Sequence, residues 1–276
     1  MEEIPLTGGW VTEGVVRVGD TVRRPSRSSS EYVRTVLEHL ERCGFDAAPR
    51  FLGYDEDGRE ALTFFEGDVL HDCHALVLTD KQLTVSAQLL KSYHDCTALL
   101  EDDAEVICHG DYGPWNLVWR DELPIAIIDF DNVHPGDRRE DVGYALWKHL
   151  NLGLIDVPVT EQARRLRVFA AAYDMPVDND LLEAIHASQE LFSRIVAGTP
   201  AVNKHERERR WLAEHGPELV GERGRPEVAL SVLPAANRRI PASSVARIAS
   251  AIRAPCVLGL LGFRSADQEP TPGRPR

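Results

Sequence analysis

The sequence predicts an α+β fold in two lobes, a small lobe rich in strands and a larger lobe that is mainly helical. Residues 1–67 contain short runs of β-branched residues separated by tight turns, which is typical of strands. Residues 68–222 carry apolar residues at helical spacing over most of their length. At 276 residues, the chain is near the length at which one hydrophobic core gives way to two.

The small lobe begins with a predicted hairpin. Residues 15–18 and 21–24 flank the pair Gly19-Asp20, and a two-residue turn between β-branched runs favours a hairpin. Ser30 is expected to cap a helix over 31–43 that ends at Gly44. Strands near 50–55 and 60–65 follow, and we interpret residues 64–67 as the hinge between the lobes, over which an adenine ring would lie.

The larger lobe, residues 68–222, is predicted to be built around one irregular loop. Strands around 105–108, 117–119 and 125–130 are expected to frame this loop, with a β-hairpin between the polar cluster of the loop and the one that follows the last strand. The helical pattern predicts helices at about 79–100, 137–150 with Asp137 at the N-cap, 160–173, 178–197 and 201–215.

The last part of the chain, residues 223–276, differs in character. It contains nine Arg and no Lys against three acidic residues, so its net charge is +6. The preceding 222 residues have a net charge of −19, and the two parts sum to the −13 of the whole chain. Its seven prolines leave room for one short helix, around 243–253. We expect a poorly ordered appendage that the fold does not need; a basic tail that binds a membrane surface or a partner is the alternative.

Composition excludes several classes of protein. A net charge of −13 argues against a nucleic-acid partner, because binding a phosphate backbone needs concentrated Lys and Arg. Five cysteines, odd in number and without a C-x-x-C pair, predict free thiols in a reducing compartment. Neither a signal peptide nor a stretch of about 18 apolar residues is visible, so we expect a cytoplasmic enzyme without a membrane span.

Two polar clusters lie close together in the sequence, ICHGDYGPWN at 107–116 and IIDFD at 127–131. Asp111 and Asn116 stand five residues apart in a loop broken by Gly and Pro, and Asp129 follows a hydrophobic strand. One carboxylate able to accept a proton, with an amide oxygen and a second carboxylate as hard ligands, suits magnesium-dependent phosphoryl transfer. Asp131 shares a strand face with Asp129 and is a further candidate metal or supporting group.

The pattern H-G-D-x-x-x-x-N followed by I-D-F-D resembles the signature of the aminoglycoside phosphotransferase and choline kinase group of small-molecule kinases, relatives of the protein kinases. The resemblance implies a two-lobed protein-kinase-like fold, with Asp111 as catalytic base and Asn116 and Asp129 as metal ligands. It makes His109 a scaffold of the catalytic loop that holds it against the metal-binding segment. It extends over about residues 6–215, but its specific motifs lie only at 109–131.

By this resemblance the chain would transfer the γ-phosphoryl group of ATP or GTP, with Mg²⁺, to a hydroxyl of a small molecule. Aminoglycosides, macrolides, choline, amino alcohols and sugars all remain open as acceptors, and a cationic acceptor is compatible with the acidic chain. A nucleotide-binding regulatory protein without turnover is the alternative, although it would have no chemical need for Asp111. A hydrolase would need a residue that activates water, and none is evident.

The residues expected to bind the nucleotide phosphates depart from the family pattern. These kinases commonly hold the phosphates with a Lys on the third strand, but this chain has no Lys before residue 81. Apolar Val22 is expected to face inward, which leaves Arg23 facing the cleft, with Glu31 or Glu38 as its partner on the helix. Gly8 and Gly9, in a glycine turn, are expected to approach the phosphates. Glu66, in the hinge, is expected to contact the nucleotide.

Two further groups of polar residues could bind a ligand or a metal ion. Acidic residues on the predicted helices of the larger lobe, namely Asp137, Asp141 and Glu190, could meet a cationic acceptor, although solvated helix faces explain them equally well. The cluster HDCH at 71–74, with His94 and Cys96, suggests a metal site, but its spacings match none of the usual zinc patterns.

Overall fold

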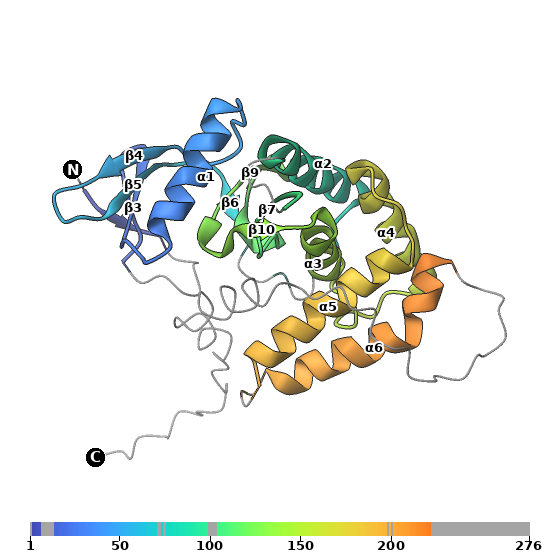
Figure 1. Cartoon of the computed structure of the whole chain (residues 1–276). Coiled ribbons are helices and arrows are strands. Elements are labelled where there is room, and N and C mark those ends of the chain that lie inside the picture. Colours follow the sequence, from blue (N-terminus) through green and yellow to red (C-terminus); the bar gives the residue numbers. More distant parts are fainter. Residues whose placement is uncertain are drawn as a thin grey trace, which may run out of the picture.

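The computed structural model describes residues 2–6, 14–70, 73, 76–98, 104–197, 199 and 201–221. A sheet with one helix forms one end of the molecule and a set of helices forms the other (Figure 1). The predicted α+β fold in two lobes is therefore confirmed. Gly8 and Gly9 and the basic tail at 223–276 lie outside the described residues, so the expectations for them stay predictions.

The small lobe is a five-stranded antiparallel sheet with strand order β1-β2-β3-β5-β4. Its strands are β1 (Ile4–Pro5), β2 (Val16–Val18), β3 (Thr21–Arg24), β4 (Phe51–Tyr54) and β5 (Glu60–Thr63). The predicted hairpin is β2–β3, with Val18 opposite Thr21. Helix α1 (Ser30–Arg42) buries Val33, Val36 and Leu40, as the helical pattern predicted. Its N-cap is Ser29, one residue before the expected Ser30.

The larger lobe holds two small sheets and five α-helices among its described residues. Strands β6 (Asp68–Val69), β8 (Leu117–Arg120) and β9 (Leu123–Ile127) form one sheet, and β7 (Val106–Cys108) pairs with β10 (His134–Gly136) in the other. The hairpin expected between the two motif halves is β8–β9. The helices are α2 (Asp80–Thr97), α3 (Arg138–Leu150), α4 (Val159–Tyr173), α5 (Asn179–Ile195) and α6 (Val202–Val220). None of the described helices is long and apolar enough to cross a membrane.

Buried apolar residues hold both ends of each motif in place. Tyr112, Leu117 and Ile127 are fully buried, and they pack in one core with Leu83 and Leu90 of α2. Burying a side chain of this kind stabilises the fold by about 1.5–3 kcal/mol. Because the strands flanking the motifs are anchored in this way, the polar loops between them are presented at fixed positions.

A covalent bond also joins the ends of two helices. Cys43, at the C-cap of α1, forms a disulfide with Cys96 near the end of α2, and their Cα atoms are 6.0 Å apart. The expectation of free thiols is therefore wrong for this pair, because the helices bring together residues that are 53 positions apart in the sequence. Cys73 and Cys108 are buried and are not in a disulfide among the described residues.

Candidate active site

Asp111 lies in a loop between β7 and a short 3-10 helix, η1 (Pro114–Asn116), and three side chains donate hydrogen bonds to its carboxylate. The Tyr144 hydroxyl donates to Oδ1 at 2.5 Å, the Asn116 amide donates to Oδ2 at 2.9 Å, and the Trp115 indole N–H lies 3.5 Å from Oδ2. Burial raises the pKa of Asp111, and these donors oppose the rise. The carboxylate is thus held in one orientation, with unused acceptor capacity.

Asn116 ends η1 and is buried. Its amide nitrogen donates both to the backbone oxygen and to the carboxylate of Asp111, each at 2.9 Å. The amide oxygen is therefore left for another ligand. The backbone oxygen of Asn116 accepts from the N–H of Ile128, which ties the loop to the segment that carries Asp129.

Asp129 follows β9 in the left-handed backbone region, with φ 64° and ψ 66°. Asp129 is exposed to solvent, and the negative charges of Asp131 and Asp111 act on its carboxylate. The surrounding protein, together with these two negative charges, raises the pKa of Asp129 to about 7. A divalent cation would relieve this repulsion, and Asp129 with the free amide oxygen of Asn116 offers the hard oxygen ligands that Mg²⁺ prefers. The residues therefore fit the ion.

Both oxygens of Asp131 accept hydrogen bonds from arginines, which fits a supporting role, and metal binding by Asp131 stays a prediction. Arg24 Nη2 lies 2.5 Å from Oδ1, and Arg27 Nη1 lies 2.7 Å from Oδ2. Arg24 is also paired with Glu60 through a contact of 2.6 Å between Nε and Oε2, and these partners raise its pKa above the ordinary value in spite of burial.

The prediction that Arg23 faces the cleft is wrong, and Arg24 takes that place. Strand alternation does put Val22 and Arg24 on one face, as expected, but the face covered by α1 is also the face that reaches Asp131. Arg23 lies on the opposite face, 3.7 Å from Asp55. The acidic partner also differs from either candidate: it is Glu60, directly opposite Arg24 on β5, whereas Glu31 and Glu38 are exposed on α1.

Glu66 has contacts with both lobes. Its backbone oxygen accepts two hydrogen bonds from Arg120, at 2.7 and 3.2 Å, and its exposed side chain lies 3.1 Å from Arg17. These contacts fix the hinge segment. They leave a nucleotide contact of Glu66 as a prediction.

A buried acid behind the loop holds the backbone of the motif. The Asp141 carboxylate accepts from the backbone N–H groups of His109 at 2.6 Å and Gly110 at 2.9 Å, and from the His94 ring at 3.1 Å. Burial would raise the pKa of Asp141, but His94, His109 and these donors outweigh it and the pKa is lowered to about 2. Asp141 is therefore a positioning residue. Because it is 1% exposed, it lies neither on a solvated helix face nor where a cationic acceptor could meet it, the two possibilities left open by the sequence.

His109 has the scaffold contact that the motif predicts. Its ring nitrogen Nε2 lies 3.1 Å from the backbone oxygen of Ile128, directly before Asp129. The ring is buried, and its Nδ1 lies 3.4 Å from the backbone nitrogen of Asp111, so His109 joins the catalytic loop to the segment that carries Asp129.

Comparisons with known proteins agree with this geometry. The model of the phosphotransferase enzyme family matches residues 36–185, more than half of the chain. The chain is 31% identical to the trifolitoxin immunity protein of Rhizobium leguminosarum bv. trifolii, over 74% of this chain and 89% of that protein. The chain belongs to the phosphotransferase enzyme family.

Solved structures show the kinase-like fold of this phosphotransferase. The gentamicin complex of APH(2")-IIa superposes with a TM-score of 0.52 and 16% identity, covering 80% of this chain and 91% of that one. A choline/ethanolamine kinase family protein from Mesorhizobium loti gives a TM-score of 0.50 and 14% identity, covering 92% of both chains. The predicted two-lobed protein-kinase-like fold is confirmed.

Beside Asp111 the phosphotransferase has four aromatic side chains that surround the ammonium of Lys148 and form a wall of the site, and the sequence pattern did not predict this cluster. The Lys148 ammonium of α3 lies 3.3 Å from the ring centroid of Trp147 and 4.6 Å from that of Phe192. The rings of Tyr144 and Trp115, both hydrogen-bonded to Asp111, are 5.5 and 5.9 Å away. Burial lowers the pKa of Lys148 to about 8. The four-residue spacing of Tyr144 and Lys148 predicts that they share a helix face, but it does not predict that this face lies opposite Asp111.

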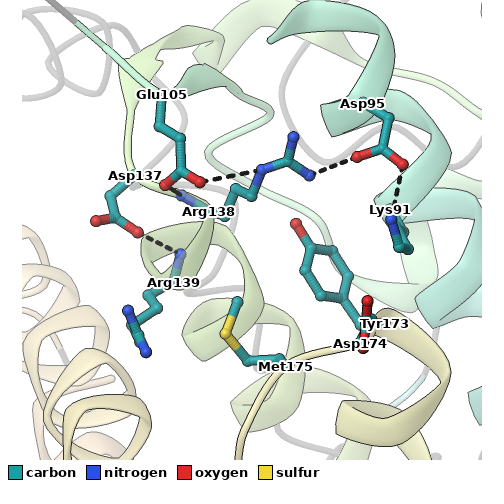
Figure 2. Close-up of a pocket in the computed structure, with 9 residues that line it drawn as sticks. All are labelled: Lys91, Asp95, Glu105, Asp137, Arg138, Arg139, Tyr173, Asp174 and Met175. Carbon is teal, nitrogen blue, oxygen red and sulfur yellow. Dashed lines mark hydrogen bonds and ion pairs between the residues drawn. The ribbon is translucent and has the colours of Figure 1, made fainter.

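A separate polar pocket of about 320 Å³ opens where α2, α3 and α4 meet. Figure 2 shows Arg138 reaching between Asp95 and Glu105, at 2.7 and 3.2 Å, while Lys91 pairs with Asp95. Neither motif contributes a lining residue. Asp137, one of the acids suggested for a cationic acceptor, lines this pocket and caps α3, as its predicted N-cap position requires. Glu190, another of these acids, pairs with Arg194.

Proposed function

We propose that this phosphotransferase transfers the γ-phosphoryl group of ATP or GTP to a hydroxyl of a small molecule. The observation that carries the proposal is the Asp111 carboxylate, fixed by Tyr144 and Asn116 in the same loop that is bonded to the Asp129 segment. This arrangement supports a role of Asp111 toward the acceptor and of Asp129 toward the nucleotide, the two roles that acidic residues have in phosphoryl transfer.

In the proposed reaction, Asp111 accepts the proton of the acceptor hydroxyl. The hydroxyl oxygen bonds to the γ-phosphorus while the bond from that phosphorus to the bridging oxygen breaks, and the nucleoside diphosphate leaves. The raised pKa of Asp111 suits this task, because a base works best when its pKa approaches the operating pH. Tyr144 and Trp115 keep the carboxylate facing the acceptor.

Asp129 and the amide oxygen of Asn116 would hold Mg²⁺ with the nucleotide. When bound, the ion neutralises charge on the phosphate oxygens. Arg24, in the place where related kinases commonly have Lys, would hold the phosphates, since a guanidinium can bind two oxygens at once and stays charged at any working pH.

The acceptor would approach Asp111 along the wall formed by Trp115, Tyr144 and Lys148. The relatives add candidates to the range left open by the sequence. One relative is a trifolitoxin immunity protein and one structure is a gentamicin complex, so a toxin joins the aminoglycosides, hydroxylated amines and sugars among the acceptors to be assayed.

The experiment measures nucleotide binding and turnover separately. Thermal shift with Mg-ATP and Mg-GTP identifies the donor, and a coupled assay of nucleoside diphosphate release across the acceptor panel identifies the acceptor. Asp111→Asn should lower turnover by about 10²–10⁴ while changing Mg-nucleotide affinity little, because Asp111 is assigned to the acceptor. Asp129→Asn should weaken Mg-nucleotide binding in calorimetry.

Asp121→Asn is the matched control, since Asp121 is exposed in the β8–β9 turn with φ 50°, a conformation that Asn tolerates. Turnover of Asp111→Asn within a few-fold of wild type would refute the assignment of the base. Nucleotide binding without transfer to any acceptor would favour the regulatory alternative. Unchanged Mg-nucleotide affinity in Asp129→Asn would make Asp129 a turn residue only.

A further inference from the structure

Three side chains with metal-binding atoms meet behind the catalytic loop, at a place that the proposed reaction does not use. They are Cys108 at the end of β7, His134 at the start of β10 and Glu140 in the first turn of α3. One ligand atom of each lies within 4.8 Å of the others, and Cys108 and His134 stand directly opposite each other in the β7–β10 pair. We propose that these three residues form a binding site for zinc or a chemically similar transition-metal ion.

The chemistry of the donors is that of zinc rather than magnesium. Thiolate, imidazole and carboxylate together favour zinc-class ions, whereas Mg²⁺ prefers oxygen ligands alone. Around tetrahedral zinc, ligand atoms lie about 3.3–3.7 Å apart, as follows from metal–ligand distances of about 2.0–2.3 Å. His134 Nε2 and Glu140 Oε1 are 2.8 Å apart, and all three atoms fall within 4.8 Å, so shifts of about 1 Å would complete the geometry.

The orientation of the His134 ring supports a ligand role. Its Nδ1 lies 2.9 Å from the backbone oxygen of Asn132, which can only accept, so Nδ1 carries a proton. Metal-binding histidines commonly donate their second ring nitrogen to a backbone carbonyl in this way, which directs the other nitrogen at the ion. Here that other nitrogen, Nε2, faces Glu140.

Gly136 keeps the space between the donors open. A Cβ at this position would lie 2.7 Å from Cys108 Sγ and 3.1 Å from Glu140 Oε2. Any larger residue would therefore enter the region between the thiol and the carboxylate. The thiol and the imidazole must give up protons to bind the ion, so affinity should rise with pH.

The site is next to the catalytic machinery without being part of it. Cys108 directly precedes His109, and Glu140 directly precedes Asp141, which holds the backbone N–H groups of His109 and Gly110. An ion bound here would join β7, β10 and α3 behind the catalytic loop. We therefore expect it to stabilise the folded protein, whether or not the proposed transfer reaction is correct.

Cobalt spectroscopy tests the site directly. The full chain, stripped of metal with a chelator, is titrated with Co²⁺ in excess Mg²⁺, which occupies oxygen sites such as that of Asp129. We expect one equivalent of Co²⁺ to give a near-ultraviolet sulfur-to-cobalt charge-transfer band that Zn²⁺ removes by competition. The band should be absent from Cys108→Ser and retained in Cys73→Ser, the matched control for a buried thiol.

Glu140→Gln provides a second, milder variant, because the Glu140 side chain is 36% exposed and the change keeps its shape. Loss of supporting residues around a metal lowers affinity about 10–100-fold, so loss of this direct ligand should weaken Co²⁺ binding at least tenfold. Zn²⁺ should raise the melting temperature of the wild type by several degrees and that of Glu140→Gln by clearly less at the same Zn²⁺ concentration.

Each remaining outcome counts against the site. A wild type without the charge-transfer band, or a band that survives in Cys108→Ser, would overturn the proposal. Should Cys108→Ser not fold, Glu140→Gln decides: unchanged Co²⁺ affinity in that variant would leave His134 and Glu140 as a plain ion pair beside a buried thiol.

Discussion

Replacing Asp141 by Asn tests the anchoring of the catalytic loop. The Asp141 carboxylate is 1% exposed and accepts three hydrogen bonds, two of them from the backbone of the motif. Asn keeps the shape but loses the charge, and its amide nitrogen replaces one accepting oxygen. One buried donor among His109 N–H, Gly110 N–H and His94 would then face an N–H group.

The magnitude follows from the pKa and the lost acceptor. Lowering the pKa of Asp141 from 3.8 to about 2 corresponds to about 2 kcal/mol in favour of the ionised group in the folded protein. An unsatisfied buried donor adds about 1–3 kcal/mol. Asp141→Asn should therefore lower the free energy of unfolding by about 3–5 kcal/mol, and turnover should fall because the loop that holds Asp111 loses its anchor.

Urea unfolding followed by circular dichroism measures the effect. Asp137→Asn is the matched control: Asp137 caps the same helix through a bond to the Arg139 N–H, and Asn caps helices as well as Asp does. Because the folded pKa is depressed, the contribution of Asp141 is complete above about pH 4 and is lost as the pH falls toward 2. The difference from wild type should thus be constant between about pH 5 and 8. A loss below about 1 kcal/mol, or equal losses in both variants, would refute the reasoning.

Three further predictions concern the cleft and the tail. Arg24→Met should raise the Michaelis constant for nucleotide at least about tenfold and lower the free energy of unfolding by about 3–5 kcal/mol, because Glu60 and Asp131 lose their buried partner. Arg23→Met should change both quantities little. Steady-state kinetics in which Arg23→Met is the damaging change would show instead that Arg23 faces the cleft. Lys148 should titrate near pH 8 in NMR of labelled lysine, a measurement made simple by the four lysines of the chain and assigned with Lys148→Arg; an ordinary lysine pKa would contradict the buried aromatic surroundings. Truncation after residue 222 should leave the melting temperature and nucleotide binding unchanged, and a large fall in melting temperature would show that the tail docks on the two lobes.

Much of the fold could be predicted because it depends on near neighbours in the sequence. The β2–β3 and β8–β9 hairpins follow from short turns between apolar runs, and α3 begins where the Asp137 cap predicts it. The motif carrying Asp111 and Asn116 is equally local, since five residues of chain cannot separate the two side chains by much. Their hydrogen bond, at 2.9 Å, is a consequence of that short loop.

Other features depend on which distant surfaces meet. The alternation of side chains along β3 predicts that Val22 and Arg24 share a face of the sheet. Only the positions of α1 and Asp131 decide that this face reaches the cleft and that the face of Arg23 does not. The pairing of Cys43 with Cys96 likewise requires two helices to end side by side.

The sequence by itself determined the α-helices, the two hairpins, the family and the residues of the two motifs, because each is encoded in a short stretch of chain, whereas strands β1, β6 and β10 were not predicted. Only the tertiary structure decided which groups surround Asp111. Tyr144 reaches it from 33 residues away, and Asp141 holds the adjacent backbone from 31 and 32 residues away. Such contacts form only when α3 packs against β7 and the loop, and the local pattern carries no information on that packing.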